Sequence, residues 1–588
     1  MIMESGFLRE HDGQYLLMGL LPAQTIPSTL QGSLIARLDQ LAPGKAIAQL
    51  GATIGRTFSH ELIQQISPFS DSDLEGGLQQ LVEAEILYQS GSTPHIEFTF
   101  KHALLQDIAY QSLLRPARQR YHEHTAHVLE LHFPEFVHTQ PELIAHHLSE
   151  AGLGSQAIPY WQRAAQRAIK RSAHIETISH LIQGLALLAT LPDAPEHTQS
   201  ELIFQLMLGN TLVKLKGYGT PEVGQAYARS RELGQQIDDP RQLSRVLYGL
   251  WVFYLTRAEF QTALELAEEL LALSTSQDDA DCRLRSHNAM GSTLCFLGEF
   301  TRARNYLTQG MACEMPRTSR TPSPADAVVP QVSNFAYASW ALWYMGFPDQ
   351  ALAASLESQR LAEERQHPFA SAVALFYASI LHQLRGEPDM AYEQANAVIS
   401  LASELEFAVW VAGGTLVRGW ALMQQGQTDE GFEQIQQGLR AWNATGAELV
   451  RPSGLAKLAQ AYEMQGDLEN GLRTLDEVLA VVNKTSMRYY EAELYRLKGR
   501  LLWMTGANDH QHMVSGAACC WRAMAIAEQQ QSKSLQLRAA TQLGQFWCQQ
   551  GEYESAQQLL RPIYDWFSEG FDTADLQEAK ALLEGLSR

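Results

Sequence analysis

Histidines gather in two short stretches, so a metal site is the first chemistry to consider. The zinc motif H-E-x-x-H places two histidines four residues apart, with a glutamate between them. His122 and His127 are five residues apart and would diverge by about 140° on a helix. We therefore interpret the cluster as solvated or capping histidines and expect no metal. Its members are His122, His124, His127, His132, His146 and His147.

Nucleotide chemistry would need the loop G-x-x-x-x-G-K-[ST], whose backbone amides surround the phosphates. Gly44-Lys45 is the nearest approach, but Asp39 stands at the first glycine position and Ala46 replaces the metal-binding hydroxyl. GYGTPEVG near Gly217 lacks the spacing of a dinucleotide-binding loop. The hydrolase motif G-x-S-x-G is absent from the sequence. We expect no catalytic residue and no cofactor in this chain.

The composition is that of an ordinary soluble protein. Of 588 residues, 45% are hydrophobic and 19% are charged, and the net charge is −21. This excess of carboxylates opposes attraction to nucleic acid or to anionic lipid. Six cysteines in so long a chain do not form a disulfide framework. Without an apolar leader or an 18-residue apolar run, the sequence favours a cytoplasmic location.

Regularly spaced glycines predict the elements that must carry any functional side chains. Gly386, Gly426, Gly466 and Gly506 are each 40 residues apart, and each ends an apolar helical run. A constant period of this length indicates stacked helical hairpins. Glycine suits the left-handed residue that ends a helix. The expected repeat-turn glycines are Gly298, Gly346, Gly386, Gly426, Gly466, Gly506 and Gly551.

Three stretches resemble the tetratricopeptide repeat: LGEFTRARNYL, QGDLENGLRTL and QGEYESAQQLL. The 40-residue spacing departs from the usual 34 of that family. It is closer to the longer variant in signal-transduction ATPases that resemble the maltose-regulon activator. We therefore expect an all-α fold, a right-handed tetratricopeptide-like superhelix over residues 201–588. A Pro-rich loop is expected at 313–330.

A small module is expected ahead of the repeats. KAIAQLGATIG, HELIQQIS and DLEGGLQQLVEAEIL have helical periodicity, and ILYQS and IEFTF have the pattern of strands. Three helices followed by a strand–turn–strand predict a winged helix at residues 28–115, opened by a short helix at about 28–41. Residues 1–27 would then be the remnant of an ATPase lid or linker, and 116–200 would be helical transition repeats.

The same region carries a wider resemblance. IPSTLQGSLIARLDQLAPGKAIAQLGATIGRTFS and FTFKHALLQDIAYQSLL resemble the segment that follows the nucleotide-binding module in bacterial AAA/STAND-type predicted ATPases. These proteins often carry a class III adenylate or guanylate cyclase domain. PELIAHHLSEAGLGSQAIPYWQRAAQRAIKRSA and EGFDTADLQEAKALLEGL fit the same family. The resemblance implies the C-terminal regulatory half of a cyclase/ATPase signalling protein, without the family's catalytic half.

The expected function is therefore a non-enzymatic sensor scaffold that binds a protein, peptide or small effector in the repeat groove. An ATPase or cyclase module, in cis or in trans, is a second expected partner. In the tetratricopeptide family the first helix of each pair lines a concave groove, and aromatic side chains there can anchor a partner. Core packing is the alternative role for each candidate. The candidate groove contacts are Trp340, Trp343, Phe376, Gln383 and Trp420.

Two other functions stay open. A DNA-binding transcriptional regulator of the maltose-activator type would use the winged helix. However, its expected groove-reading helix, DSDLEGGLQQLVEAE, carries five acidic residues and neither lysine nor arginine, which opposes phosphate contact. The other possibility is a segment of an active ATP-dependent adenylate or guanylate cyclase. Nucleic acid and membrane are not expected partners.

Overall fold

The computed structural model describes most of the chain, and its described part consists mainly of α-helices. The described residues are 8–11, 14–17, 34, 38–39, 41, 43–92, 95–237, 239–276, 279–313, 329–505 and 510–586. Most of the helix expected at 28–41, most of the Pro-rich loop and Gly506 lie outside them. Every helix among these residues is too short or too polar to span a bilayer.

The chain divides into two compact units. The first contains residues 1–164 and 186–191, and the second contains 165–185 and 192–588. The helices α9 (Gly154–Lys170) and α10 (His174–Leu188) are therefore shared between the units. The expected domain boundaries near residues 115 and 200 stay predictions.

The first unit combines short strands with helices. Its three-stranded antiparallel sheet has the order β3-β5-β4, and β1 and β2 form a separate hairpin. The expected helices and the β4–β5 pair are present, whereas β3 was not predicted because three residues are too few for an alternating pattern. The elements are β1 (Leu8–His11), β2 (Gln14–Leu17), α2 (Gly44–Ile54), β3 (Thr57–Ser59), α3 (His60–Ile66), α4 (Asp71–Glu83), β4 (Leu87–Ser92), β5 (His95–Phe100), α5 (Ala103–Gln111), α6 (Arg115–His132), α7 (Pro134–Thr139) and α8 (Pro141–Glu150).

Serine caps begin two of these helices. Ser59 Oγ accepts from the backbone N–H of Leu62, and Ser70 Oγ accepts from that of Asp73. Such caps satisfy amides that have no partner within the helix. The local sequence therefore fixes where α3 and α4 start.

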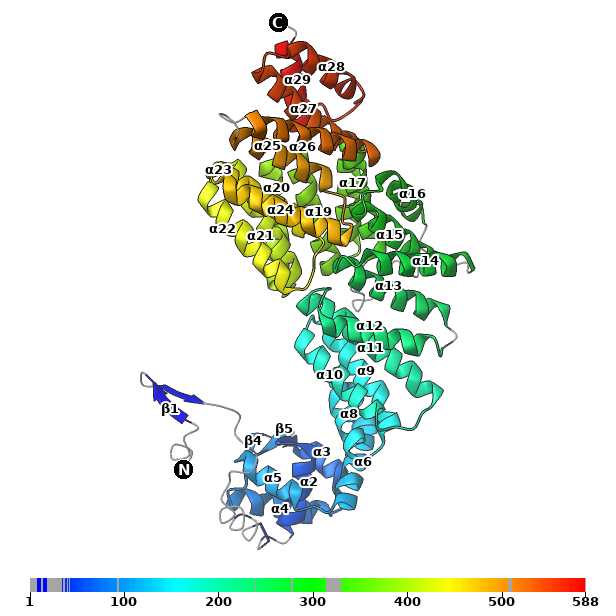
Figure 1. Cartoon of the computed structure of the whole chain (residues 1–588). Helices are drawn as coiled ribbons and strands as arrows, with labels where there is room; N and C mark the ends of the chain where they lie inside the picture. Colours follow the sequence, from blue (N-terminus) through cyan, green and yellow to red (C-terminus); the bar gives the residue numbers. More distant parts are fainter. Residues whose placement is uncertain are drawn as a thin grey trace. The chain divides into compact units, whose positions relative to one another are not determined.

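The second unit is an array of antiparallel helix pairs (Figure 1). From α11 (Pro195–Lys216) onward, each helix packs against the next one along the chain, and the first helices of successive pairs also contact one another. The expected all-α, tetratricopeptide-like repeat fold is thereby confirmed. After α9 and α10 the helices are α11 (Pro195–Lys216), α12 (Pro221–Gly234), α13 (Pro240–Thr256), α14 (Phe260–Ser276), α15 (Ala280–Phe296), α16 (Phe300–Met311), α17 (Pro330–Met345), α18 (Pro348–Glu364), α19 (Pro368–Arg385), α20 (Pro388–Glu404), α21 (Ala408–Gln424), α22 (Thr428–Ala444), α23 (Arg451–Met464), α24 (Leu468–Thr485), α25 (Glu491–Thr505), α26 (His510–Gln529), α27 (Lys533–Gln549), α28 (Tyr553–Tyr564) and α29 (Ala574–Leu586).

Glycines with positive φ occupy the turns of these pairs. Gly346 and Gly386 follow α17 and α19 with φ of +97° and +76°. Gly298, Gly426, Gly466 and Gly551 also have positive φ. The left-handed conformation frees the chain to reverse after each helix, and glycine adopts it without strain from a Cβ atom.

The array also contacts itself over long sequence distances. Hydrogen bonds in this unit, some from side chains and some between backbone groups, join residues 154 to 230 positions apart. We call these the inter-turn contacts. Beside α17 and α27, Ser532 Oγ donates to the carbonyl of Tyr344 over 2.8 Å, and Ser534 Oγ donates to that of Trp343 over 2.5 Å. The helix pair that begins with α17 therefore packs against the later pair that begins with α27.

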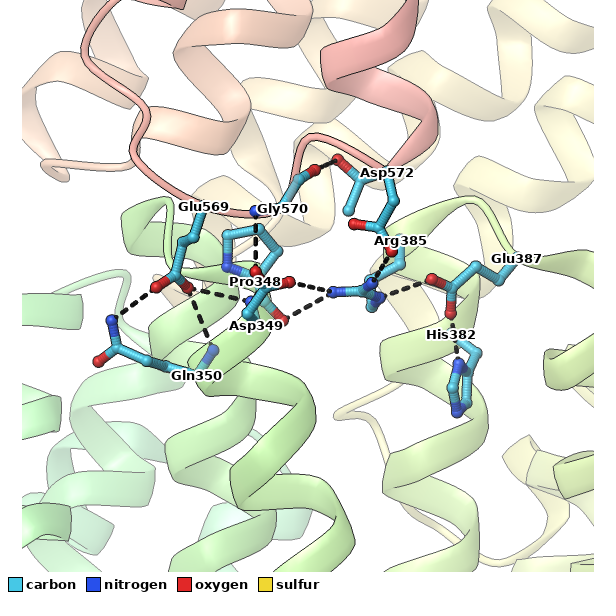
Figure 2. A network of polar contacts seen from close by, with 10 residues as sticks. Pro348, Asp349, Gln350, His382, Arg385, Glu387, Glu569, Gly570 and Asp572 are labelled. Carbon is cyan, nitrogen blue, oxygen red and sulfur yellow. Dashed lines mark hydrogen bonds and ion pairs between the residues drawn. The ribbon is translucent and has the colours of Figure 1, made fainter.

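One inter-turn contact joins the start of α18 to the connection between α28 and α29 (Figure 2). Glu569 Oε1 accepts from the backbone N–H groups of Asp349 and Gln350, over 3.0 and 3.1 Å. Asp349 Oδ2 in turn accepts from the backbone N–H of Gly570 over 3.0 Å. Glu569 thus caps a helix that lies 220 residues earlier in the sequence.

Arg385 extends this network from the end of α19 (Figure 2). Its guanidinium is buried, and it donates to the carbonyl of Pro348 over 2.8 Å and to Glu387 Oε1 over 2.7 Å. A longer bond of 3.4 Å reaches Asp572. These acceptors satisfy a buried cation that would otherwise be costly.

We predict that Glu569→Ala weakens the network locally. The substitution leaves two backbone N–H groups of α18 without acceptors. We therefore expect the free energy of local unfolding at the start of α18 to fall by about 1 kcal/mol. Hydrogen exchange measured by mass spectrometry should speed up in peptides covering 348–352 and 569–575. The control is Glu554→Ala on α28, where the carboxylate accepts only a neighbouring-turn hydrogen bond from Gln558 among the described residues. Equal exchange in the two variants would contradict the capping role.

A second prediction concerns the close approach of α21 and α22. A Cβ atom on Gly431 would lie 2.5 Å from the carbonyl oxygen of Gly419 and 2.9 Å from the backbone nitrogen of Met423. Gly431→Ala must push the helices apart, so we expect a cost of about 1–3 kcal/mol. Gly585→Ala on α29 is the control, because its Cβ would meet no atom within 4 Å. Thermal unfolding followed by circular dichroism should show a lower Tm for Gly431→Ala only.

Candidate functional site

A small cavity lies inside the second unit, among the first helices of consecutive pairs. Its volume is about 60 Å³, and every lining side chain is at most 8% exposed. Nine of its nineteen lining residues are aromatic, and none is charged. The aromatic residues are Tyr218, Tyr248, Trp251, Phe296, Tyr337, Trp340, Tyr377, Trp410 and Trp442. The others are Val252, Leu255, Thr256, Asn288, Ser333, Val373, Val409, Ala447, Leu449 and Val450.

Several polar groups of this lining are satisfied within the protein. Tyr248 donates its hydroxyl to Asn288 Oδ1 over 2.6 Å, and Trp251 Nε1 donates to Thr293 Oγ1 over 2.9 Å. Burial raises the pKa of Tyr248 and of Tyr377 well above the usual value. Both phenols are therefore neutral throughout the physiological pH range.

Three indole groups of the lining differ from that of Trp251. The Nε1–H groups of Trp340, Trp410 and Trp442 are buried and have no hydrogen-bond partner among the described residues. A buried donor without an acceptor costs about 1–3 kcal/mol.

Inter-turn contacts build one wall of the cavity. The connection between α22 and α23 supplies Ala447, Leu449 and Val450 to the lining. Within this connection, the backbone N–H of Glu448 donates to the carbonyl of Thr256 over 2.7 Å. One wall of the cavity is therefore held by a contact that joins distant parts of the sequence.

The candidate groove contacts are buried rather than displayed on an open surface. Trp340 lines the cavity, and Phe376 packs against Trp410 and Trp442 with ring centroids 5.3 and 5.9 Å away. Gln383 is buried, and its Nε2 has no hydrogen-bond partner among the described residues. Their role in binding a partner stays a prediction.

The other two candidates, Trp343 and Trp420, lie at a buried charged cluster. Lys457 Nζ lies 5.5 Å from the ring centroid of Trp420 and 6.0 Å from that of Tyr490. The side chain of Lys457 is 5% exposed, and its Nζ forms no ion pair within the described part of the chain. Arg538 lies over the Trp343 ring, 4.7 Å from the centroid. Burial lowers the pKa of Lys457 to about 7, although Glu493 partly opposes this effect.

Glu493 is the central carboxylate of the charged cluster. It forms ion pairs with Arg496 at 2.8 Å and with Arg538 at 3.6 Å. Arg538 also pairs with Asp575 at 2.8 Å. Burial raises the pKa of Glu493, but the two arginines outweigh this effect and bring it to about 2. Glu493 is therefore already engaged by two guanidinium groups.

The histidines of the first unit form a buried pair. His122 Nδ1 lies 2.8 Å from His147 Nδ1, and the Tyr110 hydroxyl lies 2.9 Å from His122 Nε2. Burial lowers the pKa of His122 to about 4. The interpretation of His122 as a solvated or capping residue was wrong, because packing of α6 against α8 encloses it. The described residues contain no group of three or more potential metal ligands.

Most aromatic residues of the cavity were missed by the sequence analysis. Tyr337 and Tyr377 nevertheless carried a signal, since each stands nine residues before a turn glycine, Gly346 or Gly386. Residues at the same position of successive repeats face the same side of the array. Trp410 and Trp442 do not repeat in this way, so their place in the cavity had no comparable signal.

No family model matches the chain. An uncharacterized protein of Rhizobium meliloti (strain 1021) is 22% identical over 520 residues, which cover 87% of this chain and 50% of that relative. The chain thus spans about half the length of the curated relative that it matches.

Three of the solved structures that resemble the chain are the following. A Rap protein complexed with competence and sporulation factor is 12% identical, with a TM-score of 0.47, and covers 64% of this chain and 99% of its own. A STAND protein with a tetratricopeptide repeat sensor from Pyrococcus horikoshii is 9% identical, with a TM-score of 0.36, over 88% and 68%. The quorum sensor NprR from B. thuringiensis is 11% identical, with a TM-score of 0.41, over 63% and 99%. At these identities the likeness concerns the fold alone.

We predict that Lys457 makes stability depend on pH. Its pKa falls from 10.5 to about 7 on folding, so between these values the unfolded chain binds more protons and stability rises with pH. Lys457→Met should flatten this rise and stabilise the protein at pH 6 by a few kcal/mol, an order-of-magnitude figure. Urea unfolding between pH 6 and 10 measures both effects.

Lys484→Met is the matched control for this measurement. Lys484 is exposed near the end of α24, so its replacement should leave the pH dependence unchanged. If Lys457→Met and the wild type have parallel pH profiles, Lys457 does not titrate as a buried amine.

Proposed function

We propose that this chain is a non-enzymatic regulatory scaffold that encloses an effector within its helical-repeat array. The observation that carries the proposal is the uncharged cavity, of whose nineteen lining residues nine are aromatic. Ligand sites in proteins are typically apolar and contain a few fixed polar groups. This cavity has that composition and lies inside the repeat unit.

The same walls suggest how binding could be transmitted. One side of the cavity comes from the first helices, and another comes from the connection at 445–450, which an inter-turn contact holds. In the closed arrangement, the one described above, the connection at 445–450 is bonded to Thr256. A ligand that binds this arrangement more tightly than one in which the contact is broken shifts the population toward the closed arrangement. The closed array would then present a different surface to a partner.

We further propose that the partner is an ATPase or cyclase module, in cis or in trans. Support comes from the sequence resemblance to the regulatory half of AAA/STAND-type cyclase proteins. The greater length of the Rhizobium relative leaves room for such a module. In this proposal the chain itself carries out no hydrolysis and regulates a catalytic half.

Residues 28–115 fit a winged helix in this proposal. The support is the element order α2-β3-α3-α4-β4-β5 and the sheet order β3-β5-β4. DNA binding through α4 is disfavoured, because Asp71, Asp73, Glu75 and Glu83 are exposed or only partly buried on this helix. A contact module within a signalling protein suits this acidic helix better.

Filling the cavity tests the proposal. Ala447→Leu adds three carbon atoms to a lining position of a cavity of about 60 Å³, so it should abolish effector binding. The protein is incubated with the small-molecule fraction of a cell extract, desalted and examined by native mass spectrometry. We expect a retained mass on the wild type and none on Ala447→Leu.

Ala444→Leu serves as the control, because Ala444 is exposed on α22, close to Ala447 in the sequence. It should retain the same mass as the wild type. Far-UV circular dichroism shows whether both variants are folded. The proposal fails if the wild type retains nothing, or if folded Ala447→Leu retains as much as Ala444→Leu.

A further inference from the structure

A second, larger pocket lies outside the cavity, where two distant stretches of the array meet. Its volume is about 880 Å³. One wall consists of the turn between α13 and α14 and the start of α14. The facing wall consists of the connection between α22 and α23, the start of α23 and the end of α24. We call it the α14 pocket.

A third pocket, of about 450 Å³, has the same construction one helix pair further along. Its walls are the turn between α15 and α16 with the start of α16 and, opposite, the start of α25 with the second half of α26. We call it the α16 pocket. Leu297 lines both pockets, so they are neighbours. Together they form the seam groove, and each volume is within the range of about 300–1,000 Å³ that is typical of ligand sites.

The 40-residue period places equivalent residues in the two pockets. Residues at the same position of successive repeats face the same side of an array. The seam groove therefore contains two copies of one site. The equivalent lining residues are Glu259 and Glu299, Phe260 and Phe300, Glu448 and Arg488, and Arg451 and Glu491.

The contact that holds the walls together repeats as well. At the α14 pocket, the backbone N–H of Glu448 donates to the carbonyl of Thr256 over 2.7 Å. At the α16 pocket, the backbone N–H of Arg488 donates to the carbonyl of Phe296 over 2.9 Å. Donors and acceptors are each 40 residues apart. Both pockets are thus clamped by the same backbone hydrogen bond.

The charges that line the α14 pocket leave one cation over. Arg257 pairs with Glu259 at 2.8 Å, and Arg451 pairs with Glu448 at 3.1 Å. Lys484 lines the same pocket and is exposed. It forms no ion pair with any described residue. One positive charge is therefore free to meet a ligand.

The α16 pocket has the same balance. Arg488 pairs with Glu491 at 2.8 Å, and Arg302 pairs with Glu299. Arg522 lines this pocket and is exposed, and its guanidinium has no carboxylate partner in the described part of the chain. Each copy of the site thus offers one unpaired cation, on a chain whose net charge is −21.

This arrangement favours separated negative charges over dense ones. One carboxylate in each pocket would meet one free cation. A chain of phosphates would bring several charges against the four carboxylates that also line the groove, and like charges repel. These acids are Glu259, Glu299, Glu448 and Glu491.

The repeat also sets the distance between the two charges. The first helices α13 and α15 contact one another, and the axes of packed helices are about 8–10 Å apart. An extended peptide advances about 3.3 Å per residue. About three residues therefore reach from one pocket to the equivalent place in the next.

We propose that the seam groove binds an extended acidic segment of a partner protein, with one carboxylate beside Lys484 and a second beside Arg522. The two carboxylates are about three residues apart in this segment. The site lies at the turns and connections of the helix pairs, and it is separate from the cavity of the proposed function. The inference therefore adds a second binding site and does not depend on the first.

Three glycine heptapeptides with blocked ends test the charge and the spacing. The first carries two glutamates three positions apart, the second two adjacent glutamates, and the third two glutamines three positions apart. Each is titrated into the full chain by calorimetry at low ionic strength, with tripolyphosphate as the dense anion. We expect the peptide with spaced glutamates to bind most tightly, and added salt to weaken it. The net charge of the chain repels every anionic probe, so binding reports the groove.

Neutral substitutions locate the binding. Lys484→Gln and Arg522→Gln should each weaken the peptide with spaced glutamates about two- to fivefold. Lys170→Gln and Arg440→Gln are the matched controls, because both residues are exposed and neither lines the groove. They should leave the affinity unchanged. Circular dichroism checks that all four variants are folded.

The outcomes separate this inference from the proposed function. Equal binding of the glutamine peptide or of adjacent glutamates would overturn the inference, as would tighter binding of tripolyphosphate. It also fails if Lys484→Gln and Arg522→Gln bind like their controls. If the spaced peptide binds as expected but the wild type retains no effector, the proposed function fails and the seam groove stands.

Discussion

Hydrogen bonds between residues 154 to 230 positions apart hold the repeat array against itself. In an isolated curved array the inner face is an open groove, and aromatic side chains there would meet water. Here the bonds of Ser532, Ser534 and Glu569 keep distant hairpins together. The inner face becomes an interior, so its aromatic residues pack on one another around a small uncharged cavity.

The residue nine positions before a turn glycine determines whether the interior is neutral or charged at two places along the array. Tyr337, Tyr377 and Lys457 each stand nine residues before a turn glycine. The tyrosines line the neutral cavity, whereas the lysine enters a cluster with Glu493 and two arginines. These three residues occupy equivalent places in their repeats, so the difference in local charge comes from the type of side chain. A single substitution in one repeat can therefore convert an apolar level of the interior into a charged one.

The features that could be predicted from the sequence are those that a local residue pattern determines. The glycine period revealed the helix pairs, because each turn needs a left-handed residue at the same point. It could not show that Trp343, Phe376 and Trp420 are enclosed, since the inter-turn contacts that cover the inner face leave no periodic signal. The burial of His122 was missed for a similar reason: its partner His147 lies on another helix.

The folding of such an array cannot be a simple sum over neighbouring repeats. Linear repeat proteins are described by the stability of each unit and its coupling to the next one. Here the cap that Glu569 places on α18 adds a coupling across 220 residues, which raises the entropic cost of reaching the native state. During synthesis, α17 and α18 emerge long before the segment that covers them. Chains that end early would expose tryptophan-rich surface, and this makes them natural substrates for chaperones.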